Sequence, residues 1–164
     1  VSTLSSLNLN PLFECDGISI GVAFNPYLPD VLFEEEIIRL KMKLKSGLVS
    51  SIWIQFGTDY ILLNSRLKLL KSIIDSSSIS NSKKSNITIF GSILIPSKQF
   101  LARFKFRPWK GVYCSNEFLD SVENANIILK NIFATYKKNN IHPIIETGIY
   151  TDEHLKKLKN SFLD

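Results

Sequence analysis

The feature that most constrains this chain is a fourfold alternation between short apolar runs and longer amphipathic runs. The apolar runs are rich in Ile, Val and Phe and cover residues 18–24, 51–56, 87–95 and 142–147. Runs of this length and composition are typical of strands that are buried on both faces. Because an amphipathic run follows each of them, the sequence predicts four βα units with parallel strands.

The amphipathic runs carry signals for where each helix begins and ends. We expect four helices, opened by Asp30, Asp59, Asn116 and Thr151, with the third the longest. The first has glutamates in its opening turns and lysines in its last, and Gly47 should end it. These signals favour a helix after every predicted strand.

Repeated βα units with right-handed crossovers form either an open doubly wound sheet or part of a (βα)8 barrel. Four units are about half of a barrel. We expect residues 1–17 to be the tail of an upstream element and residues 18–164 to form the half-barrel. The polar, serine-rich stretch 75–86 predicts a surface loop. The chain begins with Val1 rather than Met, which indicates a fragment.

Composition narrows the class of protein. At 164 residues, with 45% hydrophobic and 21% charged residues, the chain is expected to form one globular domain. No apolar run approaches the roughly 20 residues that span a bilayer, so we expect a soluble, cytoplasmic protein with no membrane partner. Cys15 and Cys114 lie far apart and predict no metal site. The net charge of +5 favours anionic ligands without choosing among them.

The segment 98–110 interleaves five cations with four aromatic side chains. Such interleaving can bind single-stranded nucleic acid through phosphate contacts and base stacking. The alternative, which we favour, is a short helix whose Phe100 and Phe104 pack inward at i, i+4 while the cations face water. We therefore expect no nucleic-acid partner.

Two amides follow predicted strands. Gln55 ends the second apolar run and Asn25 follows the first. In a βα barrel the carboxyl ends of the strands and the loops after them build the active site. A carboxamide both donates and accepts hydrogen bonds, which suits recognition of a heterocycle edge. A glutamine that only satisfies loop backbone, and a plain turn at the two prolines after Asn25, would explain these residues equally well.

The order of motifs resembles the C-terminal half of methylenetetrahydrofolate reductase, a flavin-dependent (βα)8 barrel. The similarity covers ISIGVAFNPYLPD at 18–30, LKMKLKSG at 40–47, IQFGTD at 54–59 and IFGSILIP at 89–96, and then Gly111-Val112 before the long helix. Each motif is short, but four in the right order cover most of the chain. The resemblance implies the C-terminal half of a TIM barrel.

The resemblance also implies an activity and roles for individual residues. The family reduces methylenetetrahydrofolate to methyltetrahydrofolate with FAD and NAD(P)H. By resemblance, Gln55 contacts the pterin, Phe100 packs on the aminobenzoate ring and Lys43 lies near the flavin phosphates. Asp59 matches the aspartate that ends the glutamine motif, and Asn25, in the loop after the first strand, is expected to bind the cofactor together with Lys43.

The chain departs from the family in ways that affect function. Phe24 and Leu28 stand where typical members place a tyrosine and a histidine against the flavin. The segment 25–30 is instead similar to the branch fused to a homocysteine methyltransferase. The family's acidic residues for proton transfer would lie upstream, and only Glu146 offers a carboxylate at a similar position. We therefore expect no catalytic residue here, an inactive isolated chain, and a partner that supplies the N-terminal half of the barrel or a second chain. A flavin-free folate-binding or scaffolding half-barrel is the alternative.

Overall fold

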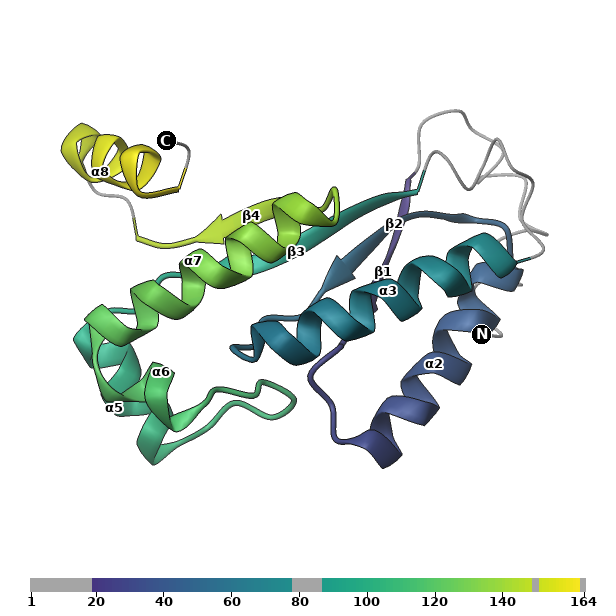
Figure 1. Cartoon of the computed structure of the whole chain (residues 1–164), viewed down its shortest axis with the longest axis horizontal. Coiled ribbons are helices and arrows are strands. Elements are labelled where there is room, and N and C mark those ends of the chain that lie inside the picture. The colour runs from purple at the N-terminus through teal and green to yellow at the C-terminus, as the bar shows by residue number, and fades with distance from the viewer. Residues whose placement is uncertain (1–18, 78–86, 149–150, 163–164) are drawn as a thin grey trace.

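The computed structural model describes residues 19–77, 87–148 and 151–162. Its centre is one parallel sheet of four strands in the order β1-β2-β3-β4 (Figure 1). The strands are β1 (Ile20–Phe24), β2 (Val49–Ile54), β3 (Thr88–Leu94) and β4 (His142–Glu146). The predicted α/β class with parallel βα units is therefore confirmed. The predicted tail, residues 1–17, lies outside the described residues.

Helices follow every strand. They are α2 (Asp30–Lys45), α3 (Tyr60–Ser76), α5 (Lys98–Phe106), α6 (Asn116–Asp120), α7 (Val122–Lys138) and α8 (Asp152–Phe162). Because α3 extends to Ser76, the predicted loop 75–86 was wrong in its first two residues, and most of the remainder lies outside the described residues. The side chain of Asp59 caps α3 by accepting from the Leu62 N–H, as predicted.

Two predicted helix starts were wrong in detail. Asp30 is the first residue of α2 rather than its cap, and the capping position is Pro29. The helix predicted from Asn116 is broken into α6 and α7 at Ser121, whose backbone is extended. The Ser121 side chain accepts from the Asn124 N–H and so starts a new helix. Ser121 was the sequence signal for this break, because serine is a favoured helix-capping residue. The apolar periodicity continues across it and so predicted one helix.

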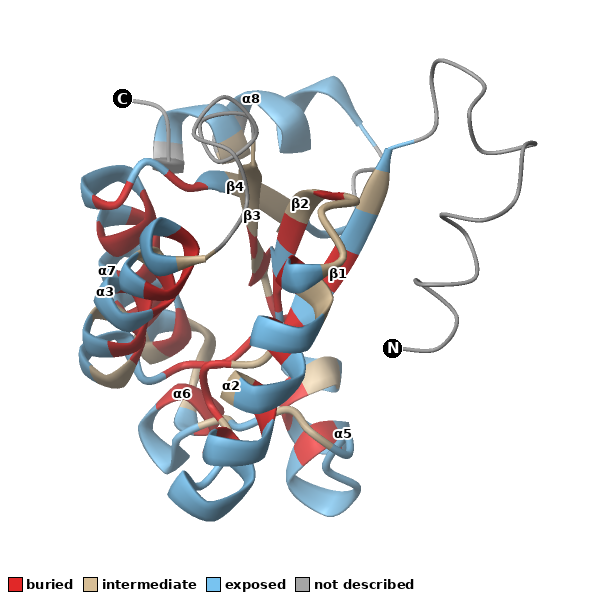
Figure 2. Cartoon of the chain, turned by 90° about the vertical axis from the view of Figure 1, so that its right-hand side faces the viewer, coloured by how far each residue is buried: buried red, intermediate tan, exposed pale blue. Residues whose placement is uncertain are grey.

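The strand order has a direct consequence for the architecture. Consecutive strands are neighbours, and the order does not reverse among the described strands, so a doubly wound sheet does not fit this part of the chain. Right-handed crossovers between neighbouring strands place their helices on one face, and Figure 2 shows α3 and α7 together on one side of the strands. The core lies between these layers and includes Phe24, Ile52, Ile93, Leu67 and Ile132.

The opposite face of the sheet carries a row of rings that crosses three neighbouring strands. Trp53 pairs in register with Phe90, and Phe90 with His142. The ring centroids are 4.7 Å apart for the first pair and 5.7 Å for the second. Trp53 is 46% exposed. Parallel sheets are usually covered on both faces. We therefore expect a further element to pack against this face.

In the described ranges, no helix combines the length and the apolarity that crossing a membrane demands.

Candidate functional site

A loop formed by residues 107–115, here called the crossing loop, lies over the carboxyl ends of β1 and β2. The Asn25 Nδ2 donates to the Gly111 carbonyl at 2.8 Å. The Thr58 N–H donates to the Tyr113 carbonyl at 3.2 Å, and the Thr58 hydroxyl accepts from the Ser115 N–H at 2.7 Å. Polar groups at the ends of two strands therefore hold the crossing loop in place.

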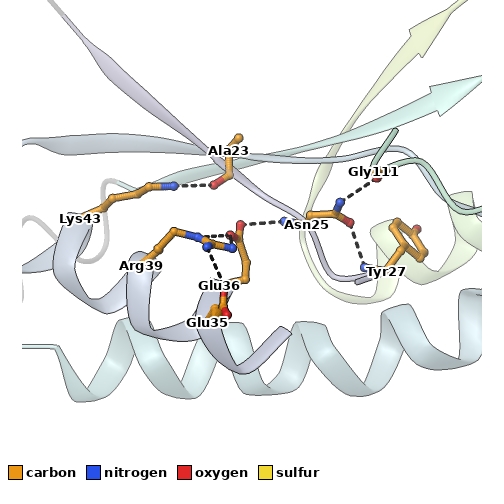
Figure 3. A network of polar contacts seen from close by, with 8 residues as sticks. All are labelled: Ala23, Asn25, Tyr27, Glu35, Glu36, Arg39, Lys43 and Gly111. Carbon is orange, nitrogen blue, oxygen red and sulfur yellow. Dashed lines mark hydrogen bonds and ion pairs between the residues drawn. The ribbon is translucent and has the colours of Figure 1, made fainter. Parts of the chain in front are cut away.

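Asn25 lies at the carboxyl end of β1, as predicted, but its side-chain amide is hydrogen-bonded within the protein (Figure 3). While Nδ2 binds the crossing loop, Oδ1 accepts from the Tyr27 N–H at 3.1 Å. The Asn25 N–H donates to Oε1 of the buried Glu36 at 3.1 Å. Arg39 in turn pairs with Glu36 at 3.1 Å. Asn25 thus joins β1, α2 and the crossing loop.

Lys43 lies in the last turn of α2 and reaches back to β1. Its Nζ donates to the Ala23 carbonyl at 3.2 Å (Figure 3). The next carbonyl, that of Phe24, accepts from the Gln55 N–H of the neighbouring strand segment, and carbonyls alternate in direction along a strand. The Ala23 carbonyl therefore faces away from β2, toward the edge of the described sheet, and Lys43 shields that edge as lysines commonly do.

Gln55 is exposed and lies at the same end of the sheet as Asn25. The hydrogen bond of 2.9 Å from the Gln55 N–H to the Phe24 carbonyl fixes this proximity. The Gln55 Oε1 accepts from the Phe56 N–H at 3.0 Å. Its Nε2 has no hydrogen-bonding partner within the described ranges, so it offers two donor hydrogens to a ligand.

Phe100 belongs to an aromatic cluster on α5 rather than to the ends of β1 and β2. Its ring centroid lies 5.7 Å from that of Phe104 and 5.3 Å from that of Trp109. Phe104 is buried and Phe100 is half-buried. The predicted short helix with inward rings is therefore confirmed for Phe104 and in part for Phe100.

A hollow of about 570 Å³ lies between the crossing loop and the starts of α3 and α6. Its lining includes Asp59, Lys105, Tyr113 and Cys114. None of the four predicted ligand-binding residues, Asn25, Lys43, Gln55 and Phe100, is among its lining residues. The structure thus brings Asn25 and Gln55 to one end of the sheet, but this hollow is built from other residues.

Two tyrosines and one cysteine in and beneath the hollow have raised pKa values and are neutral at pH 7. Burial raises the pKa of Tyr27 well above its usual range, and the neighbouring Tyr136 adds to the effect. Burial likewise raises the pKa of Tyr136, whose hydroxyl donates to the Ser92 carbonyl at 3.3 Å. Burial raises the pKa of Cys114 to about 12. No described group of three or more His, Cys, Asp and Glu side chains is arranged to hold a metal ion.

These pKa shifts predict a loss of stability in alkaline solution. An acid whose pKa rises on folding contributes fully below its unfolded pKa, about 9 for Cys and 10 for Tyr, and destabilises the fold as the pH rises above it. We expect the free energy of unfolding to be nearly flat from pH 7 to about 8.5 and to fall above about pH 9. Urea unfolding at a series of pH values measures this.

Tyr27→Phe isolates one contribution to that loss. The Tyr27 hydroxyl is buried and interacts only weakly with the neighbouring Tyr136 hydroxyl, so its removal should change stability at pH 7 by no more than about 1 kcal/mol and should lessen the alkaline fall. Tyr113→Phe, at a more exposed position, is the matched control. If Tyr27→Phe lowered stability at pH 7 by more than about 1 kcal/mol, the hydroxyl would form a full hydrogen bond with Tyr136.

Two buried charges that shape this end of the molecule were not predicted from the sequence. Arg66 donates to the Pro26 and Leu28 carbonyls at 2.6 Å each, and Glu36 receives the Asn25 N–H. Both fall on the apolar stripes of their helices, next to core leucines. A charged residue on a buried stripe was the signal that could have identified them.

Comparison with known proteins identified no family for this chain. No family model matches the chain, and no curated protein sequence matches it.

Proposed function

We propose that this chain is the C-terminal half of a (βα)8 barrel and part of a methylenetetrahydrofolate reductase-like, flavin-dependent oxidoreductase. The observation that carries the proposal is the sequential order of four parallel strands with Asn25 and Gln55 at their shared carboxyl end. Active sites of (βα)8 enzymes lie at that end. The proposed reaction rests on the order of the sequence motifs that resemble this family.

The face of the sheet that bears Trp53 supports the proposal that these residues form only half of a barrel. Trp53 is half exposed on that face, and β1 and β4 are the edges of the described sheet. In a closed barrel this face would be interior and both edges would be paired. The remaining strands would come from the same polypeptide or from a partner, and would bring the acid that this half does not offer.

Two residues of this half can take part in ligand binding. The Gln55 carboxamide, with Nε2 unpaired among the described residues, would orient the pterin of the folate. If another strand paired with β1, the Ala23 carbonyl would gain a backbone partner and Lys43 would be free to offset a phosphate charge of FAD. When bound, the flavin would carry a hydride from NAD(P)H to the one-carbon unit.

A flavin-free folate-binding half-barrel is the second candidate, and a specific observation favours it. Both oxygen and nitrogen of the Asn25 amide already bind backbone, and Phe24 is completely buried in the core. Neither side chain therefore offers much to a flavin. The first candidate predicts a yellow protein with flavin absorbance, whereas the second predicts a colourless protein that still binds folate.

A calorimetric titration with methyltetrahydrofolate tests both candidates. In the natural polypeptide that contains these residues, Gln55→Ala should weaken folate binding by about tenfold or more, because a site built around a hydrogen-bonding amide loses its donor. Asn126→Ala, which removes an exposed amide on α7, is the control and should change the affinity less than about twofold. Absence of folate binding in the unmodified protein would exclude both candidates.

A further inference from the structure

The segment 98–110 is the most strongly cationic part of the chain. It contains Lys98, Arg103, Lys105, Arg107 and Lys110 and no acidic residue. Within the described ranges, none of these five cations lies within ion-pair distance of a carboxylate. Asp120 and Glu123 line a hollow together with Lys98 and Lys105, but no carboxylate lines the neighbouring pocket that holds Arg103 and Arg107. An anionic ligand would complement these two arginines.

A pocket of about 560 Å³ lies in this segment and is lined by residues of α5 and of the turn that follows it. Phe100, Phe104 and Trp109 contribute to its wall and pack edge to face or tilted, with centroid distances between 5.3 and 6.0 Å. Arg103 and Arg107 line the same pocket. Rings and guanidinium groups thus meet in one concave site.

Some of the rings in this pocket are exposed to water. Phe106, also in the lining, is 93% exposed and Trp109 is 54% exposed. Large exposed aromatic side chains beside a pocket commonly mark a binding site. A flat ring of a ligand stacked on them would remove this surface from water, while its anionic group paired with a guanidinium.

We propose that this pocket binds a small planar aromatic molecule that carries a carboxylate or phosphate group. Its size falls within the roughly 300–1,000 Å³ of small-molecule pockets. The nine residues of α5 span only about 14 Å, too short for the run of several nucleotides that single-strand binders hold. A small ligand therefore fits better than a nucleic-acid strand.

The site does not depend on the proposed function. It is built from α5 and the adjoining turn alone, so it exists with or without the other half of a barrel. Its ligand chemistry has two sources: the carboxylate of a simple aromatic acid and the phosphate of a mononucleotide. Both place one ring against the aromatic wall and one anion beside Arg103 or Arg107.

Calorimetric titrations of the full chain distinguish these sources. The probes are 4-hydroxybenzoate and AMP, with acetate and inorganic phosphate as matched anions without a ring. We expect at least one aromatic probe to bind, and its ring-free counterpart to bind at least about tenfold more weakly. The Arg103→Gln/Arg107→Gln double variant should weaken the aromatic probe by about tenfold or more.

The control is the Lys130→Gln/Lys138→Gln double variant, which removes two exposed charges from α7 and should change the affinity less than about twofold. Circular dichroism verifies that each variant folds. Equal binding of ring-free anions, no effect of the arginine substitutions in a folded protein, or binding of neither probe would overturn the proposal. Tighter binding of a single-stranded oligonucleotide, with a site of several nucleotides, would replace it with a nucleic-acid surface.

Discussion

Replacing Arg66 with Leu is expected to lower the free energy of unfolding by about 2–5 kcal/mol, because two carbonyls lose the donor that satisfies them. The Arg66 guanidinium is buried and donates to Pro26 and Leu28 at 2.6 Å each. It also lies 3.7 Å from the centroid of the Phe33 ring. The substitution would leave the loop between β1 and α2 without its anchor on α3. Urea unfolding at neutral pH measures the loss.

The matched control is Asp30→Asn. Asp30 accepts from Arg66 at 2.7 Å, but its side chain is 96% exposed. Solvent therefore screens the ion pair, and water can accept the hydrogen bond when the carboxylate is removed. We expect a change of no more than about 1 kcal/mol. If Arg66→Leu cost as little as Asp30→Asn, the two backbone carbonyls would be satisfied by other means and the anchoring role would be wrong.

Gly91→Ala is expected to destabilise the fold by about 1–3 kcal/mol or more, as overpacking of a well-packed core does. A Cβ atom at this position in β3 would overlap the ring of Tyr136. That ring belongs to α7 and is completely buried, and its hydroxyl donates to the Ser92 carbonyl, so it has little room to move. The thermal unfolding midpoint should fall with the free energy.

Gly21→Ala is the matched control on the other face of the sheet. Its Cβ would meet the side chain of Trp53, which is half exposed and can turn away. We expect a loss below about 1 kcal/mol. A loss as large as that of Gly91→Ala would indicate that the face bearing Trp53 is packed against another element in solution, as the proposed closed barrel requires.

The candidate site was predictable in its location but not in its bonding. Because parallel strands share a carboxyl end, the positions of Asn25 and Gln55 in the sequence were enough to predict that they lie together. The sequence did not show that the Asn25 amide would bind Gly111, 86 positions away, or that Lys43 would bind the Ala23 carbonyl. A side chain's hydrogen bonds depend on which distant backbone groups the fold brings within about 3 Å.

The sequence by itself determined the local elements of this protein. Apolar runs and helical periodicity specified four strands and the helices between them, and Asp59 and Thr151 marked helix starts that the structure confirms. These signals act between neighbours in the chain, so they survive without tertiary context.

Only the tertiary structure decided which polar groups became partners and which surface stayed open. Arg66 and Glu36 were buried against the segment that follows β1, and the row of rings around Trp53 was left on a face that the described helices do not cover. Each outcome depends on contacts between segments far apart in sequence, where desolvation and hydrogen bonding are set by the neighbours that folding supplies.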